Sequence, residues 1–251
     1  MRLVITRDYK HSSELAAEQI MNVIREKPDC LVGLATGSTP IGVYNCISEA
    51  YRQKRVDLSR IRIINLDEYV GLPQEDQNSY FYFMKKHLLD PCNIPADRIY
   101  IPDGTKPANA EIERMNAFMD EHSVDVQLLS VGTNGHIGFN EPDDVFFDRY
   151  HEVVLAESTR RSNSRFFSSM DEVPERAITM GIGGIMRARK IVFLATGDAK
   201  LEAMKAILEE GDVTPRVPGT ILKFHCDCTI YLDNDLAKGI KPAKYIDVIK
   251  A

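Results

Sequence analysis

Three loops of this 251-residue chain combine glycines with side chains that can transfer protons or bind anions. The richest is Val131–Pro142, which holds His136 and, five residues later, Glu141. A carboxylate beside a histidine orients the ring and makes it a stronger base, which suits acid–base catalysis near neutral pH. Asn134 and Asn140 add two amides. An isolated loop histidine is commonly structural, but this density of polar groups among glycines favours a functional loop.

A second loop follows the apolar run Ile61–Leu66 and begins with two adjacent carboxylates, Asp67 and Glu68. Enzymes with α/β folds keep catalytic groups at the carboxyl ends of strands, where a partly desolvated carboxylate can act as a base. Neighbouring side chains of an extended chain point in opposite directions, so we expect only one of the two to face a substrate. The alternative is a solvated turn before Gly71 and Pro73.

The third loop, Ala35–Pro40, joins the apolar run Leu31–Leu34 to a helical pattern and places Gly37 before Ser38 and Thr39. A glycine and the free N–H groups at a helix amino terminus suit a phosphate group. The loop lacks both the Gly-Lys-Ser/Thr of a P-loop and the three-glycine spacing of a dinucleotide-binding loop. An ordinary strand-to-helix turn with an N-cap remains open as the alternative.

Short apolar runs alternate with amphipathic stretches along most of the chain, which predicts an α/β fold with helices on both faces of a mostly parallel, Rossmann-like sheet. About six or seven strand candidates are too few for a TIM barrel, so we expect an open, doubly wound sheet. Ligands of such sheets bind outside the carboxyl ends of the strands, where the three loops lie. The expected strands are Arg2–Ile5, Leu31–Leu34, Ile61–Leu66, Val126–Val131, Ile191–Ala195 and Thr229–Leu232, and the expected helices are Ser13–Arg25, Pro40–Arg55, Ala108–Glu121 and Ala199–Glu210.

The chain shows no internal repeat, low-complexity tract or linker, so residues 1–251 are expected to form a single domain. Ser12 or Ser13 is the expected cap of the first helix. The segment His151–Met180 interrupts the alternation and has little core periodicity. We expect it to be a mobile cover.

Composition narrows the class of protein. With 31 Lys and Arg against 37 Asp and Glu, the net charge of −6 argues against a nucleic-acid binder. The start of the chain has neither a signal-peptide pattern nor an apolar run that spans a membrane. Five cysteines at irregular spacing are typical of reduced thiols, so we expect a cytoplasmic protein.

Cys226 and Cys228, beside His225, raise the question of a metal site. At this spacing both thiols of an extended segment point to the same face. No second Cys/His pair completes a tetrahedral set, and the sequence signature of zinc deaminases is absent. We therefore expect buried strand cysteines and no metal.

The loops taken together resemble the glucosamine-6-phosphate deaminase family, also called glucosamine-6-phosphate isomerases. The resemblance runs from the first strand to near the end of the chain, in the family's order and spacing. It implies conversion of glucosamine 6-phosphate and water to fructose 6-phosphate and ammonium during N-acetylglucosamine breakdown, with no cofactor. The matching stretches are Leu34–Pro40, Asp67–Pro73, Gly135–Pro142 and Asn163–Phe167.

The resemblance also implies roles for single residues. Asp67 matches the base that moves a proton between C2 and C1 of the opened sugar. His136 matches the group that opens the sugar ring, with Glu141 as its partner. Asn134 stands where some members carry aspartate, so this histidine has one carboxylate fewer around it. The residues that match the phosphate-binding groups are Thr36, Gly37, Ser38, Thr39, Arg165 and Lys200.

Some members of the family are hexamers that N-acetylglucosamine 6-phosphate activates at a basic site. In the corresponding segment this chain reads Asp144, His151 and Val153, and only Arg149 remains basic. We expect a monomer or homo-oligomer without this activation. The family's active-site lid corresponds to about His151–Met180.

Two other functions are weighed against this one. A 6-phosphogluconolactonase-like hydrolase shares the fold and a similar Gly-x-Asn/Asp-Gly-His loop, but Asp67–Pro73 and Asn140–Pro142 favour the deaminase. A non-catalytic sugar-phosphate sensor is disfavoured because no helix-turn-helix segment precedes the first strand and all three catalytic candidates are present.

Overall fold

The computed structural model describes all 251 residues, and eight of its strands form one large sheet. Every pairing in this sheet is parallel, which confirms the predicted open α/β architecture. The strands are β1 (Arg2–Thr6), β2 (Leu31–Leu34), β3 (Arg62–Asn65), β5 (Ile99–Tyr100), β6 (Val126–Leu129), β9 (Ile191–Ala195), β10 (Cys228–Asp233) and β11 (Asp247–Lys250). Their order across the sheet is β11-β1-β10-β9-β6-β2-β3-β5.

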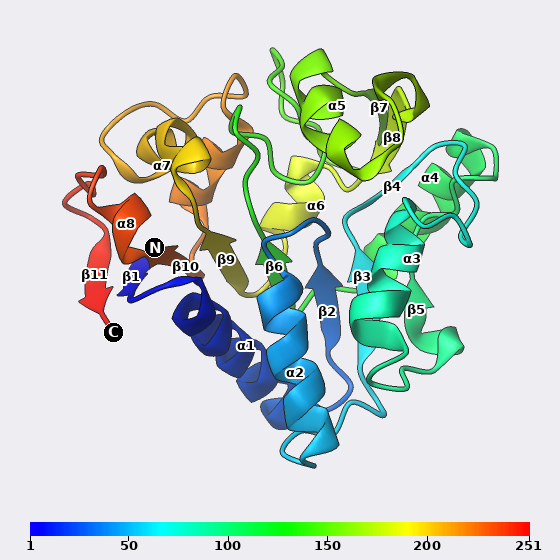
Figure 1. Cartoon of the computed structure of the whole chain (residues 1–251), viewed down its shortest axis with the longest axis horizontal. Helices are drawn as coiled ribbons and strands as arrows, with labels where there is room; N and C mark the ends of the chain where they lie inside the picture. The colour runs from blue at the N-terminus through cyan, green and yellow to red at the C-terminus, as the bar shows by residue number, and fades with distance from the viewer.

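Helices flank the large sheet, and the two ends of the chain meet at its β11 edge (Figure 1). None of the helices combines the length and the hydrophobicity needed to cross a bilayer. The helices are α1 (Tyr9–Glu26), α2 (Ile41–Arg52), α3 (Tyr80–Met84), α4 (Ala108–Glu121), α5 (Glu157–Asn163), α6 (Ile182–Met186), α7 (Leu201–Leu208) and α8 (Asn234–Ala237).

The sheet separates two hydrophobic cores, and single strands supply both. In β9, Val192 and Leu194 pack into the core that contains α1 and α2, whereas Ile191 and Phe193 pack into the core that contains α4, α6 and α7. Successive strand residues point to opposite faces, so a strand covered on both sides must be apolar throughout. This explains why the buried strands appear in the sequence as continuous apolar runs.

The direction in which the chain adds strands reverses beside β2. From β2 the chain continues outward to β3 and β5, then returns to β6 on the other side of β2 and proceeds to β9 and β10. At such a switch point the loops that leave neighbouring strands diverge and open a crevice at their carboxyl ends. The loops Ala35–Pro40 and Ser130–Pro142 leave β2 and β6 at this crevice.

A second, three-stranded antiparallel sheet lies beside the crevice, in the order β4-β8-β7. Its strands are β4 (Asp67–Tyr69), β7 (His151–Val154) and β8 (Arg176–Thr179). The predicted strand Ile61–Leu66 ends at Asn65, and the chain enters β4 two residues later. The expected cover, His151–Met180, therefore holds β7, α5 and β8, which the periodicity did not indicate.

Two local predictions were wrong. Helix α1 begins at Tyr9 and is capped by Asp8, whose side chain accepts a 2.8 Å hydrogen bond from the backbone N–H of His11. Ser12 and Ser13 lie inside the helix and are buried, because the helix starts earlier than its apolar stripe. Of the two cysteines near the end, one matches the expectation of buried strand cysteines and the other does not. Cys228 is buried in β10, but Cys226 precedes the strand and is exposed.

Candidate active site

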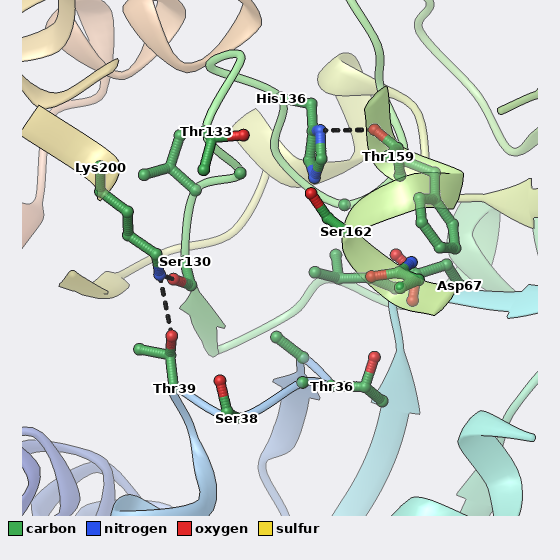
Figure 2. Close-up of a pocket in the computed structure, with 18 of the residues that line it drawn as sticks. Thr36, Ser38, Thr39, Asp67, Ser130, Thr133, His136, Thr159, Ser162 and Lys200 are labelled. Carbon is green, nitrogen blue, oxygen red and sulfur yellow. Dashed lines mark hydrogen bonds between the residues drawn. The ribbon is translucent and has the colours of Figure 1, made fainter. Parts of the chain in front are cut away.

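A cavity of about 700 Å³ lies at the carboxyl ends of β2, β6 and β9. Its walls come from the loops after these strands, from the start of β4, and from α5 with the 3-10 turn Ser164–Phe166 that follows it. Figure 2 shows Lys200 and Thr39 at one end, with Asp67, His136 and Thr159 at the other. The predicted site residues that line it are Thr36, Gly37, Ser38, Thr39, Asp67, His136, Arg165 and Lys200.

The loop after β2 is built to expose its polar groups. Gly37 adopts a φ of 95°, which favours glycine. Helix α2 follows with Pro40 at its N-cap position and without a side-chain cap, so the N-cap alternative is not what the structure contains. The hydroxyls of Ser38 and Thr39 are thus left for other partners. Tyr9, which the sequence did not indicate, braces this loop by donating to the carbonyl of Thr39 at 3.0 Å.

Two cations converge on this end of the cavity. Lys200 donates from Nζ to Oγ1 of Thr39 and to Oγ of Ser130, both at 2.8 Å. Burial, with a smaller contribution from the positive charge of Arg165, lowers the pKa of Lys200 to about 8. Neither cation forms an ion pair with a carboxylate of the chain. Two clustered positive charges without a counter-ion, beside hydroxyl groups, make an anion site.

At the other end, His136 belongs to a connected set of side chains. Its Nδ1 lies 3.4 Å from Oε2 of Glu141. Asn134 donates to the same Oε2 at 2.7 Å and accepts from the backbone N–H of His136 at 3.2 Å. Asn134 and Glu141 therefore lie behind the histidine and do not line the cavity.

The Glu141 carboxyl group is biased toward its charged form. Burial acts to raise its pKa, but the hydrogen bond and charge of His136 and the hydrogen bonds of Thr159 and Asn134 outweigh burial, and the pKa is lowered. A charged carboxylate at this position orients the imidazole through Nδ1. The Nε2 atom is then the ring nitrogen left for a ligand.

Gly132 makes room for the histidine ring. A Cβ atom at this position would lie 2.2 Å from Cε1 of His136, far inside van der Waals contact. The glycine is needed here because the ring packs directly against the backbone of the strand-end loop.

Asp67 and Glu68 have separate environments, as the alternation of an extended chain predicts. Asp67 lines the cavity with only 5% of its surface exposed. Burial, and then the charge of Glu68, raise its pKa well above the ordinary value. Glu68 points away and accepts backbone hydrogen bonds of 2.8–2.9 Å from Tyr69, Tyr80 and Phe81. Both carboxylates are buried, so the alternative of a solvated turn is wrong.

The cover segment closes the cavity from the side of β4. Asn163 on α5 donates a 2.8 Å hydrogen bond to the hydroxyl of Tyr69. Thr159, one turn earlier, has Oγ1 at 3.5 Å from Nδ1 of His136 (Figure 2). Thr159 and Ser130 were not among the predicted site residues. The strand-end position of Ser130 is a signal that would have found it, whereas no local pattern marks Thr159.

No group of three or more His, Cys, Asp or Glu side chains is arranged to hold a metal ion. The chemistry that the site offers is anion binding at one end and proton transfer by a buried carboxylate and an imidazole at the other.

Comparison with known proteins agrees with this arrangement. The model of the family described as glucosamine-6-phosphate isomerases/6-phosphogluconolactonase matches residues 9–230. A glucosamine-6-phosphate deaminase of Clostridium beijerinckii is 44% identical over 243 residues, covering 96% of this chain and 100% of that protein. The solved structure of a monomeric glucosamine-6-phosphate deaminase superposes with a TM-score of 0.91 at 38% identity, covering 95% of this chain and 99% of that one.

A 6-phosphogluconolactonase structure from Leishmania guyanensis has a TM-score of 0.77 at 20% identity, covering 96% of this chain and 99% of that one, which shows the shared fold alone. The deaminase matches cover a similar share of the chain but are about twice as identical in sequence, at 38–44%. The chain belongs to the glucosamine-6-phosphate deaminase family.

Proposed function

We propose that the protein converts glucosamine 6-phosphate and water to fructose 6-phosphate and ammonium. The observation that carries the proposal is one cavity with two unpaired cations at one end and a buried carboxylate beside an imidazole at the other. A phosphorylated sugar presents an anion at C6 and its reacting atoms at C1 and C2, which matches this separation of functions. Near-full-length relatives named as deaminases support the same reaction.

The phosphate binds at Lys200 and Arg165, with the hydroxyls of Ser38 and Thr39 and the loop Thr36–Gly37 around it. A lysine with a pKa of about 8 is mostly charged at pH 7, and a bound phosphate dianion stabilises that charge further. The bound phosphate fixes the position of C1 and C2 beside the proton-transfer groups. This fixed geometry lowers the entropic cost of the reaction.

Ring opening comes first, because the C2 proton becomes acidic only beside a free aldehyde. His136 moves a proton between the ring oxygen and O1 through Nε2, while Glu141 and Asn134 hold the other side of the ring. An imidazole held through Nδ1 can accept a proton from O1 at Nε2 and then donate it to the ring oxygen.

Asp67 then carries the proton from C2 to C1. Its abstraction of the C2 proton gives an enolamine, and return of the proton to C1 gives a ketose imine, which water hydrolyses to fructose 6-phosphate and ammonium. The raised pKa makes Asp67 a stronger base than an exposed carboxylate. The substrate's amino group, when protonated, favours the charged carboxylate that the step requires.

Ammonium release from glucosamine 6-phosphate is the direct test, run beside hydrolysis of 6-phosphogluconolactone on the same preparation. The proposal expects ammonium release that Asp67→Asn lowers about 100-fold or more while phosphate binding is kept. Lactone hydrolysis without ammonium release would favour the 6-phosphogluconolactonase-like function. Binding of a sugar phosphate without turnover of either compound would favour the sensor.

We further propose that the protein is a hydrolase and that it acts in the cytoplasm. We also propose that residues 1–251 form one domain. Five free cysteines support a reducing compartment. The similarity to a monomeric deaminase supports a monomer, and the scarcity of basic residues near Arg149 supports the absence of activation by N-acetylglucosamine 6-phosphate. Light scattering should give the mass of a single chain, 28.4 kDa. The dependence of rate on glucosamine 6-phosphate concentration should be hyperbolic, and addition of N-acetylglucosamine 6-phosphate should not change it.

A further inference from the structure

Thr159 is a buried hydroxyl residue beside the His136–Glu141 pair, although it comes from a different part of the chain. Only 4% of its surface is exposed. Its Oγ1 lies 3.5 Å from Nδ1 of His136, at the outer limit of a hydrogen bond. The same hydroxyl is one of the groups that lower the pKa of the Glu141 carboxyl group. Figure 2 shows the Thr159 hydroxyl directed at the imidazole.

The helix that carries Thr159 is fixed on both sides. Asn163, one turn later, is hydrogen-bonded to Tyr69 of β4. Arg160 donates from Nη2 to the carbonyl of Val173 at 3.0 Å, which ties α5 to the chain that returns toward β8. The position of the Thr159 hydroxyl therefore depends on the packing of α5 against the cavity.

We propose that Thr159 is a positioning residue for ring opening, whose hydroxyl aligns the His136 imidazole with Glu141 and makes their alignment depend on the docking of α5. The inference rests on the proposed deaminase function and assigns a residue that acts through His136. Thr159 needs no contact with a reacting atom for this role.

The neighbouring groups explain why a hydroxyl matters here. Asn134 is neutral, so Glu141 is the one carboxylate that faces Nδ1 of His136 within ion-pair distance. The groups that face Glu141 are His136 and Asn134 from its own loop and Thr159 from α5. Its other oxygen, Oε1, is buried without a hydrogen-bond partner. Loss of one of so few polar neighbours leaves the carboxylate less stabilised and the ring free to turn.

The test compares Thr159→Val, which replaces the hydroxyl by a methyl group of similar size, with Thr159→Ser, which keeps it. Ser158→Ala is the matched control, because it removes an exposed hydroxyl from the preceding residue of the same helix. Ammonium release is measured from pH 5 to 9, and binding of 2-amino-2-deoxyglucitol 6-phosphate, an open-chain alcohol, is measured by calorimetry.

We expect Thr159→Val to lower kcat about 10-fold, with KM and alcohol binding within about twofold of wild type. Because a group that lowers the pKa of Glu141 is lost, the acidic limb of its kcat profile should move to higher pH. Thr159→Ser should recover most of the rate, and Ser158→Ala should match wild type.

Equal rates and pH profiles for Thr159→Val and Ser158→Ala would overturn the inference. A Thr159→Ser variant as slow as Thr159→Val, or parallel loss of alcohol binding and turnover, would also overturn it by pointing to packing alone. These results differ from failure of the proposed function, in which the wild-type protein itself releases no ammonium.

Discussion

The side-chain amide of Asn134 donates a 2.7 Å hydrogen bond to Oε2 of Glu141, the same oxygen that faces Nδ1 of His136. Through its other end Asn134 accepts from the backbone of His136, so both ends of this amide are used. An asparagine can donate to a carboxylate, whereas an aspartate at this distance repels it. The choice between the two residues therefore sets the charge of the group behind the histidine.

Replacement of Asn134 by aspartate should raise the pH at which activity is lost on the acid side. Two adjacent carboxylates hold a proton more tightly than one, so the pKa of the pair should be about one unit higher than that of Glu141 alone. The pH dependence of kcat/KM measures this. An acidic limb that is unchanged, or that moves to lower pH, would contradict the expected repulsion.

Asp67→Asn should lower kcat by about 10²–10⁴, because the amide cannot accept the C2 proton. Phosphate binding should persist, since the phosphate end lies across the cavity from Asp67 (Figure 2). Rapid-quench measurement of ammonium, with calorimetric titration of inorganic phosphate as control, separates the two effects. Turnover equal to that of wild type would remove Asp67 from the mechanism.

The same substitution should stabilise the fold. Burial raises the pKa of Asp67, so its charged form costs stability that grows as pH rises above the ordinary value of 3.8. Asp67→Asn carries no such cost, and its Tm at pH 7.5 should exceed that of wild type by a few degrees. The difference should shrink as pH falls toward 4. A pH-independent difference in Tm would indicate another cause.

Lys200→Met should weaken binding of inorganic phosphate by about 10- to 100-fold, the contribution of one or two hydrogen bonds to a charged group. In wild type the affinity should also fall as pH rises above about 8, because the lysine loses its proton there. That pH dependence should be absent from the variant. Lys205→Met, on α7 and paired with Glu202, is the charge-matched control. If both variants bind phosphate equally well, Lys200 is not its ligand.

Gly132→Ala should displace the His136 ring, since the added carbon would lie 2.2 Å from Cε1. We expect a loss of kcat of about 10-fold or more. The double variant with His136→Ala tests the cause, because a methyl group that acts only on the ring has nothing further to disturb once the ring is gone. Additive losses in the double variant would show that Gly132 acts elsewhere.

Six of the eight strands of the large sheet could be predicted from the sequence because their signals are local, whereas the edge strands β5 and β11 were not expected. The run Ile191–Ala195 is apolar at every position and is a strand buried on both faces. The loops after β2 and β6 were found for the same reason, since each joins such a run to polar residues and glycines. Asp67 was found as a strand-end carboxylate, although it begins a strand of the smaller sheet.

What the sequence could not predict depends on distant contacts. Strands β7 and β8 are short and lack a continuous apolar run, since β7 begins with His151 and Glu152 and β8 with Arg176. Their pairing depends on distant contacts, because β8 lies between β7 and β4, which is far away in the sequence. Tyr9 and Thr159 reach the cavity only because α1 and α5 pack beside it. The helix cap was missed because Asp8 precedes the apolar stripe of α1.

The smaller sheet has one further consequence. Val154 pairs with Arg176 where β7 ends and β8 begins, so residues 155–175 leave and rejoin the smaller sheet at one place. At the other end of β8, Thr179 pairs with both His151 and the proposed base, Asp67. A closed excursion of this kind can be lengthened, shortened or exchanged without disturbing the registers of the eight-stranded sheet. This excursion carries both Thr159, at the reacting end, and Arg165, at the phosphate end. A graft of residues 155–175 onto the eight-stranded scaffold should therefore change both ends of the cavity together.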